Sequence, residues 1–309
     1  MAITPADLVT MHSYLTTTNP GSAPYHYSFH FSRITTIVNN RRSGWKPTIN
    51  EYIEGMIRAM LTNFRSWILV APHWKTITAI FKSFSPSFIK MTPPAVFVSS
   101  ISAVIGGSVV LAKQMDVLSH NVKVLEDIFK TYSPSGEPFE VYFKSISSTY
   151  PMLNESDLDE FTQPKGTYKL DQMGVPLVSE FLKNMGFELP KPDRHLKRFL
   201  SSSRMGNSKN PFKATDEKVF TQIQDLAKSS TFTIPQIDLI IWSFCANGFG
   251  EICAADRKNL NAIYVLSAQT VLILHSLRRL QLLQHLRQRL LLRQRRLRLL
   301  QQLQNKLIS

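Results

Sequence analysis

The sequence feature that most constrains the fold is a helical spacing of apolar residues, which begins near Thr48 and returns in segment after segment. In the first segment the apolar residues follow one another at intervals of three and four: Tyr52, Ile53, Met56, Ile57, Met60 and Leu61. This spacing places them on one face of an α-helix, whereas a half-buried strand would alternate at every second residue. Similar patterns recur over residues 74–84, 117–132, 139–148, 176–185 and 194–201, with proline or glycine between them. We therefore predict a mostly α fold of many short to medium helices.

The chain divides by composition into three parts. Residues 1–47 are polar and aromatic, contain the helix breakers Pro20, Gly21 and Pro24, and show no sustained period. They are predicted to form a poorly ordered N-terminal arm outside the fold. Residues 48–260 carry the helical pattern and form the predicted domain. Residues 261–309 become rich in Leu, Gln and Arg, which indicates either a low-complexity basic helix or a tail that is not native.

The net charge of +14 is concentrated near the C-terminus. Residues 257–309 hold 11 Lys or Arg and no acidic residue, so that 25 basic residues face 22 acidic ones in residues 1–256. The predicted domain is only mildly basic, and charge alone does not identify a nucleic-acid partner.

The cellular compartment is constrained weakly. Two cysteines, Cys245 and Cys253, are too few for a disulfide framework, and the N-terminus lacks the pattern of a secretory signal. We expect the nucleus or cytoplasm rather than secretion, while the Ser- and Thr-rich residues 8–45 leave organelle targeting open. Residues 95–112 carry no charge, but four serines and the Gly106–Gly107 pair favour two buried helices around a glycine turn. No stable membrane association is expected.

The most specific motif is Leu-Asp-Gln-Met-Gly-Val-Pro-Leu-Val-Ser-Glu-Phe-Leu at residues 170–182, followed by Lys-Pro-Asp-Arg-His-Leu-Lys-Arg at residues 191–198. It resembles the helix–hairpin–helix DNA glycosylase superfamily, in which a hairpin similar to L-P-G-V-G-x-x-T-A precedes V-D-x-H-V-x-R. On this resemblance, Gly174 matches the second hairpin glycine, Val178 a small packing position and Asp193 the catalytic aspartate. His195 and Arg198 match the later histidine and arginine. The resemblance implies a multi-helix glycosylase fold.

The chemistry of this motif can be understood from its residue types. A glycine turn at a helix N-terminus leaves backbone N–H groups that can hold a DNA phosphate. A carboxylate at the start of the next helix, here Asp193, can then stabilise an oxocarbenium-like sugar and orient the attacking water. Asp193 could instead only cap that helix. The predicted DNA-binding residues are Gln172, Met173, Gly174, Lys191, Arg194, Lys197 and Arg198.

Two residues depart from the family pattern. Gln172 replaces the first hairpin glycine, so the turn is expected to be less tight. Pro176 stands where bifunctional members carry the Schiff-base lysine, and proline cannot form a Schiff base. This predicts a monofunctional enzyme without the lyase lysine, although Lys169 or Lys183 could substitute.

Flanking segments add to the resemblance. The segment Leu-Thr-Asn-Phe-Arg-Ser-Trp at residues 61–67 is similar to a region of endonuclease III-like proteins and of 3-methyladenine DNA glycosylase I, and Ser-His-Asn-Val-Lys-Val-Leu at residues 119–125 resembles their N-x-x-K helix. Trp67 could line a base pocket or belong to the core. Ala59 replaces an acidic residue that helps 3-methyladenine recognition, which puts that specificity in doubt.

The segments 237–242 and 250–253 resemble the entry to an iron–sulfur loop, although Trp242 lies in an apolar run typical of core. Only Cys253 of the four-cysteine pattern is present, so neither an iron–sulfur cluster nor another metal or cofactor is expected.

These patterns together predict a monofunctional DNA N-glycosylase of base excision repair. It would act as a monomer on double-stranded DNA and hydrolyse the N-glycosidic bond of a flipped damaged or mispaired base. Two alternatives remain open: a non-catalytic helix–hairpin–helix DNA-binding protein, and a scaffold or membrane-peripheral protein driven by the basic tail. Which base is excised cannot be predicted from this pattern.

Overall fold

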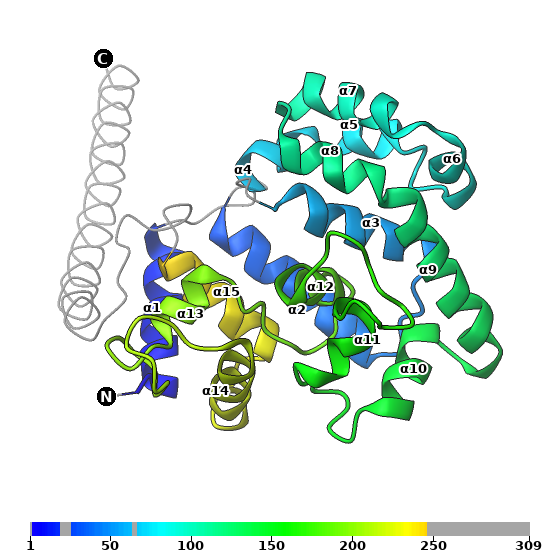
Figure 1. Ribbon diagram of the computed structural model, residues 1–309. Coiled ribbons are helices and arrows are strands. Elements are labelled where there is room, and N and C mark those ends of the chain that lie inside the picture. Colours follow the sequence, from blue (N-terminus) through cyan, green and yellow to red (C-terminus); the bar gives the residue numbers. More distant parts are fainter. Residues whose placement is uncertain (1, 19–25, 64–66, 246–309) are drawn as a thin grey trace, which may run out of the picture. The chain divides into compact units, whose positions relative to one another are not determined.

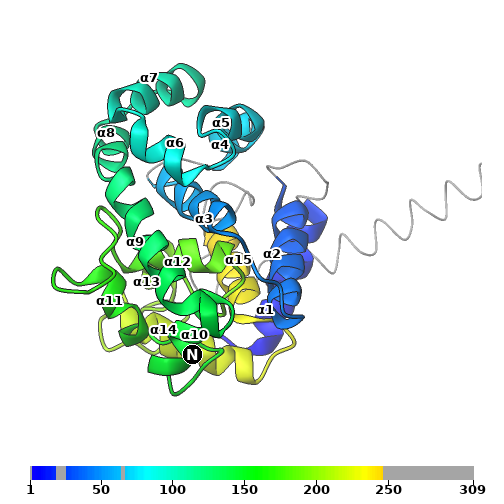
Figure 2. The ribbon, with the colours of Figure 1, turned by 90° about the vertical axis from the view of Figure 1, so that its right-hand side faces the viewer.

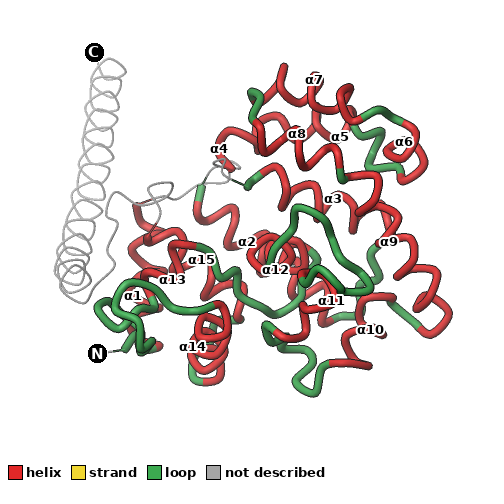
Figure 3. Tube along the Cα trace, in the orientation of Figure 1, coloured by secondary structure: helices red, strands yellow, loops and turns green. Residues whose placement is uncertain are grey.

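The computed structural model describes residues 2–18, 26–63 and 67–245, which form helices and loops and contain no strand (Figures 1 and 3). The predicted mostly α fold is confirmed. The α-helices are α1 (Pro5–Thr18), α2 (Tyr27–Arg42), α3 (Ile49–Leu61), α4 (Trp67–Val70), α5 (Trp74–Ile80), α6 (Pro86–Met91), α7 (Pro94–Ile105), α8 (Val109–Asp116), α9 (Leu118–Tyr132), α10 (Pro138–Ile146), α11 (Asp159–Thr162), α12 (Val175–Asn184), α13 (Arg194–Phe199), α14 (Asp216–Lys228) and α15 (Ile234–Cys245). Three 3₁₀ turns are η1 (Ala71–His73), η2 (Ser133–Ser135) and η3 (Ser156–Leu158). The predicted tail at 261–309 and Cys253 lie outside the described residues.

Helix α3 is the central helix of the domain and packs against both α12 and α9 (Figures 1 and 2). A capping box starts it: the Thr48 hydroxyl accepts from the Glu51 N–H, and the Glu51 carboxylate accepts from the Thr48 N–H. Its apolar face is buried as the spacing predicts. A Cβ on Gly55 would lie 2.6 Å from Met185 Sδ, so glycine permits the close approach of the end of α12.

The prediction of a poorly ordered N-terminal arm outside the fold is wrong, because residues 5–18 and 27–42 form α1 and α2 of the packed domain. Helix α1 contacts α2 and α15, and Leu8, Met11 and Leu15 are fully buried. These contacts order a segment whose own sequence has little amphipathic pattern, because most helical stability in proteins comes from tertiary packing.

A buried arginine attaches α2 to the rest of the domain. Arg41 donates to Glu137 Oε2, Tyr52 Oη and the Met185 carbonyl, each at 2.9 Å. Its guanidinium carbon also lies 4.1 Å from the centre of the Phe187 ring. These partners come from widely separated segments, so the sequence of α2 could not indicate that Arg41 belongs to the core.

Residues 95–112 form α7 and α8 with Gly106 and Gly107 between them, as predicted, and Gly106 has a φ of 81° that favours glycine. The predicted burial of the whole pair is wrong, because only one face is buried, through Phe97 and Ile101 among others, while Val109 is exposed. Among the described residues, no helix has both the length and the apolar character needed to span a membrane.

Candidate functional site

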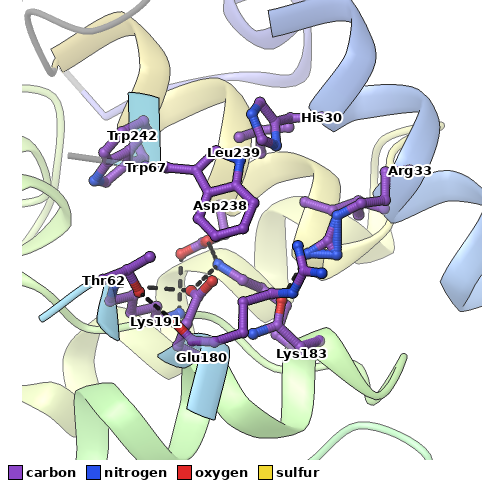
Figure 4. A pocket seen from close by; sticks show the side chains of 13 residues that line it. His30, Arg33, Thr62, Trp67, Glu180, Lys183, Lys191, Asp238, Leu239 and Trp242 are labelled. Atoms are coloured by element: carbon purple, nitrogen blue, oxygen red, sulfur yellow. Dashed lines mark hydrogen bonds and ion pairs between the residues drawn. The ribbon is translucent and has the colours of Figure 1, made fainter. Parts of the chain in front are cut away.

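A cavity of about 120 Å³ lies among α2, α3, α4, α12 and α15 (Figure 4). An engineered apolar cavity of about 150 Å³ binds benzene, so this space can hold one ring of a planar base. The lining residues come from segments far apart in the sequence: His30, Arg33, Ile34, Arg58, Thr62, Trp67, Glu180, Lys183, Asn184, Lys191, Asp238, Leu239 and Trp242.

An ion cluster of Glu180, Lys183, Lys191 and Asp238 forms one wall of this cavity (Figure 4). The Lys183 ammonium donates to Asp238 Oδ2 and lies 2.8 Å from Glu180 Oε2. The backbone N–H of Lys191 donates to Asp238 Oδ1 at 2.9 Å, and its ammonium lies 3.8 Å from Glu180 Oε2. The side chains of Lys183 and Asp238 are only 9% and 2% exposed, so each buried charge depends on its partners.

The cluster keeps Lys183 in its charged form. Burial alone would lower the pKa of Lys183, but Asp238 and Glu180 outweigh burial and hold this pKa above its ordinary value. Burial alone would likewise raise the pKa of Glu180, but Lys183 and Lys191 lower it to about 2. A permanently protonated amine is a poor nucleophile. This arrangement argues against Lys183 as a substitute for the lyase lysine.

A second wall combines arginine and tryptophan side chains. The Arg58 guanidinium carbon lies 4.8 Å from the Trp67 ring centre and 4.2 Å from that of Trp74, within the range of cation–π attraction. Glu54 Oε1 accepts hydrogen bonds from Arg58 Nη2 and from Trp74 Nε1. These contacts fix Trp67 beside the cavity, which it lines as the base-pocket interpretation requires.

Arg33 extends from α2 toward the ion cluster (Figure 4). Its Nη2 donates to Asn184 Oδ1 at 2.8 Å, while its buried Nε has no hydrogen-bond partner among the described residues. Burial and the nearby charge of Arg58 lower the pKa of Arg33 to about 9. This guanidinium remains charged at neutral pH, yet no carboxylate is within hydrogen-bonding reach in the described contacts.

Asp193 is not among the residues that line this cavity. It is the N-cap of α13, and its Oδ1 accepts from the His195 and Leu196 backbone N–H groups at 2.8 and 3.2 Å. Lys191, two residues earlier, lines the cavity, and the His195 ring packs edge-on at 6.3 Å from the ring of Trp242, another lining residue. Burial lowers the pKa of His195, which favours its neutral form. The carboxylate is half-buried and is held in a defined position by the cap.

A turn at residues 170–173 precedes α12, and its left-handed residue is not a glycine. Gln172 adopts a φ of 58°, whereas Gly174 is extended at φ −83° and ψ 179°. A turn therefore forms at these residues, but the preceding helix along the chain is the four-residue α11, which ends at Thr162. Asn121, on α9, holds it in place, since its side chain accepts from the Asp171 N–H at 2.8 Å and donates to the Asp171 carbonyl at 3.0 Å.

The predicted DNA-binding residues divide into three groups. The side chain of Met173 is buried in the core, so only its backbone could contact DNA, and its N–H already donates to the Leu170 carbonyl at 3.2 Å. Lys197 is paired with Asp216. The exposed surface beside Asp193 retains Arg194 and Arg198 on α13, with Gln172 and Gly174 exposed on the hairpin and Lys191 at the cavity.

Several lining residues were missed by the sequence analysis. Arg33 and His30 belong to the segment predicted to be an arm, and Trp242 was assigned to the core but lines the cavity. One signal was available: Asp238 interrupts the apolar run Ile-Asp-Leu-Ile-Ile of α15, and a buried carboxylate requires a partner. Its partner, Lys183, is 55 residues away in the sequence.

Comparisons with protein-family models, with curated proteins and with solved structures give no match to this chain. Within residues 2–18, 26–63 and 67–245, no group of three or more His, Cys, Asp or Glu side chains could hold a metal ion.

Proposed function

We propose that this chain is a monofunctional DNA N-glycosylase with a helix–hairpin–helix glycosylase fold. The observation that carries the proposal is the order of three features along the chain: a turn before α12, the capped Asp193 before α13, and a ring-sized cavity that residues of α12 and Lys191 help to line. Each feature occurs widely, but together they supply a backbone contact, a carboxylate and a base pocket.

In the proposed reaction, the hairpin and the exposed arginines of α13 hold the DNA backbone while the target nucleotide is flipped. The base enters the cavity beside Trp67 and Trp242, where aromatic surface replaces the lost base stacking. The bond between the base and C1′ of the sugar breaks, and the electron pair leaves with the base. Asp193 stabilises the positive charge that develops on the sugar and orients water toward C1′. The water oxygen bonds to C1′ and one proton of the water passes to the departing base, so the products are the free base and an abasic site.

The test uses the full chain, because removing residues 1–47 would also remove α2 and the cavity residues His30 and Arg33. Base release is measured from duplexes containing uracil, 8-oxoguanine, 3-methyladenine or a mismatch. Asp193→Asn is the matched variant, since asparagine caps a helix about as well as aspartate but carries no charge. We expect base release to fall about 10²–10⁴-fold with DNA affinity and thermal stability unchanged.

The cap itself favours a second candidate, a non-catalytic helix–hairpin–helix DNA-binding protein. In this candidate Asp193 caps α13 and has no catalytic role. This candidate predicts DNA binding without base release from any duplex, and Asp193→Asn would then change nothing measurable.

The DNA interface can be tested separately through the salt dependence of binding. Each lost phosphate contact lowers the slope of log K against log salt by about 0.9. Arg194→Met and Arg198→Met should each reduce this slope, whereas Lys197→Met should not, because Lys197 is engaged with Asp216. If all three variants keep the slope of the unmodified chain, the DNA must contact another surface of the protein.

A further inference from the structure

The charges that line the cavity do not balance. Four lining side chains are cationic, Arg33, Arg58, Lys183 and Lys191, while only Glu180 and Asp238 are anionic. Counting Lys and Arg against Asp and Glu, the lining carries a net positive charge that repels a cationic ligand.

The carboxylates around the cavity are already engaged. Glu180 lies between the ammonium groups of Lys183 and Lys191, and Asp238 accepts from Lys183 and from the Lys191 backbone. Glu54, one turn before Arg58 on α3, accepts hydrogen bonds from Arg58 and from Trp74. A cationic ligand would therefore have to displace an existing buried partner before it could pair with an acidic group, which is costly.

Arg33, in contrast, still has donor capacity. Its Nη2 donates to the neutral amide oxygen of Asn184, and its Nη1 makes no hydrogen bond to a described residue and is not sealed from the cavity as the buried Nε is. Burial disfavours the charge on Arg33 most, the charge of Arg58 adds to this effect, and Glu180 and Glu54 offset it in part. A ligand oxygen that accepts a hydrogen bond from Arg33 would pair this donor, and its partial negative charge would offset the repulsion between Arg33 and Arg58.

The ring of Trp67 offers little cation–π attraction to a ligand. Tryptophan commonly binds cations through its ring face, but the ring of Trp67 already carries the Arg58 guanidinium at 4.8 Å. A neutral ring can still stack on exposed aromatic surface, because that contact requires no positive charge.

We propose that the cavity accepts a neutral base whose edge carries carbonyl oxygens, an oxidised or deaminated base, and rejects the cationic bases formed by N-alkylation. This inference rests on the proposed function and names the substrate class of the same site. Arg33 is the specificity-determining residue, because it offers the unpaired donor that an acceptor oxygen would satisfy.

The first experiment compares base release by the full chain from duplexes containing uracil, hypoxanthine or 8-oxoguanine with release from duplexes containing 7-methylguanine or 3-methyladenine. We expect kcat/KM to be at least about 10²-fold higher for the carbonyl-bearing group, as for other sites that hydrogen-bond their substrate. Arg33→Met should reduce kcat/KM for that group by about 10²-fold. Arg33→Lys should restore part of the loss. Arg42→Met is the matched control, since Arg42 lies on the same helix, pairs with Glu188 and is half-exposed.

Faster release of the alkylated bases would overturn the inference and leave the proposed function intact. If Arg33→Met does not fold, as judged by circular dichroism, the preference of the unmodified chain decides between the two base classes.

A binding experiment covers the case in which no duplex releases a base and the proposed function fails. Tryptophan fluorescence is titrated with 8-oxoguanosine, a neutral purine nucleoside with a carbonyl at C8, and with 7-methylguanosine, a cationic one with a methyl group at N7. Quenching by 8-oxoguanosine alone, lost in Arg33→Met and retained in Arg42→Met, would support the inference. Equal quenching by both nucleosides, or none by either, would overturn it.

Discussion

Replacing Lys183 by methionine tests whether the ion cluster stabilises the fold as its geometry implies. The substitution keeps most of the side-chain volume but removes the ammonium that pairs with Asp238 and Glu180. Their side chains are only 2% and 20% exposed, so water can reach them poorly once the ammonium is gone. Breaking a buried pair in this way costs about 3–5 kcal/mol. Since domains of this size are stable by about 5–15 kcal/mol, the variant should fold but with much less stability.

The assay is urea unfolding of the full chain at pH 7, followed by far-UV circular dichroism. The double variant Lys183→Met, Asp238→Leu also removes the Asp238 carboxylate that the single variant leaves unpaired. It should therefore regain at least about 1 kcal/mol of the lost unfolding free energy, in line with measured couplings between contacting residues. Lys228→Met is the control, because its partner Asp225 is exposed and a surface pair contributes less than about 1 kcal/mol. A loss below about 1 kcal/mol in Lys183→Met, or a double variant no more stable than the single one, would refute this account of the cluster.

Three further predictions concern acid stability and the hairpin. Because the pKa of Glu180 is lowered from 4.5 to about 2, its ionisation stabilises the fold above pH 4.5 by about 3 kcal/mol. This contribution is lost as the pH falls from 4.5 toward 2. In urea unfolding between pH 5 and pH 2.5, the unfolding free energy of Glu180→Gln should therefore decline less than that of the unmodified chain. An equal decline in both would contradict this role of Glu180. Gln172→Gly should raise the unfolding free energy by up to about 1 kcal/mol, because glycine adopts the positive φ without strain; thermal melting against Gln172→Val, which should be destabilised, checks the sign. Asn121→Ala removes two hydrogen bonds to Asp171 and should cost about 1–3 kcal/mol, with faster amide exchange in residues 170–174; unchanged exchange there would mean that Asn121 does not hold the hairpin.

Local pattern was sufficient to predict much of the helical structure. The spacing of three and four identified α3, α9, α10 and α12, since each buries one continuous stripe of side chains against neighbouring helices. The Pro-Asp pair before α13 marked Asp193 as a helix cap, because a cap depends only on the residues within one turn. The glycine pair between α7 and α8 was likewise recognised as a turn.

The same local rules failed where stability or function depends on partners distant in the sequence. Helix α2 lacks a clear apolar face, and one of its buried side chains is the charged Arg41. The partners that allow its burial, Glu137 and Tyr52, lie in other segments, so no local pattern reveals them. The cavity wall requires Lys183 to meet Asp238 across 55 residues. Trp242 faces this cavity, although the apolar run around it is typical of core. Helix periodicity and caps arise from interactions within a few residues, and could therefore be predicted from the chain alone. The pairing of buried charges and the lining of the cavity arise only when separate helices pack together.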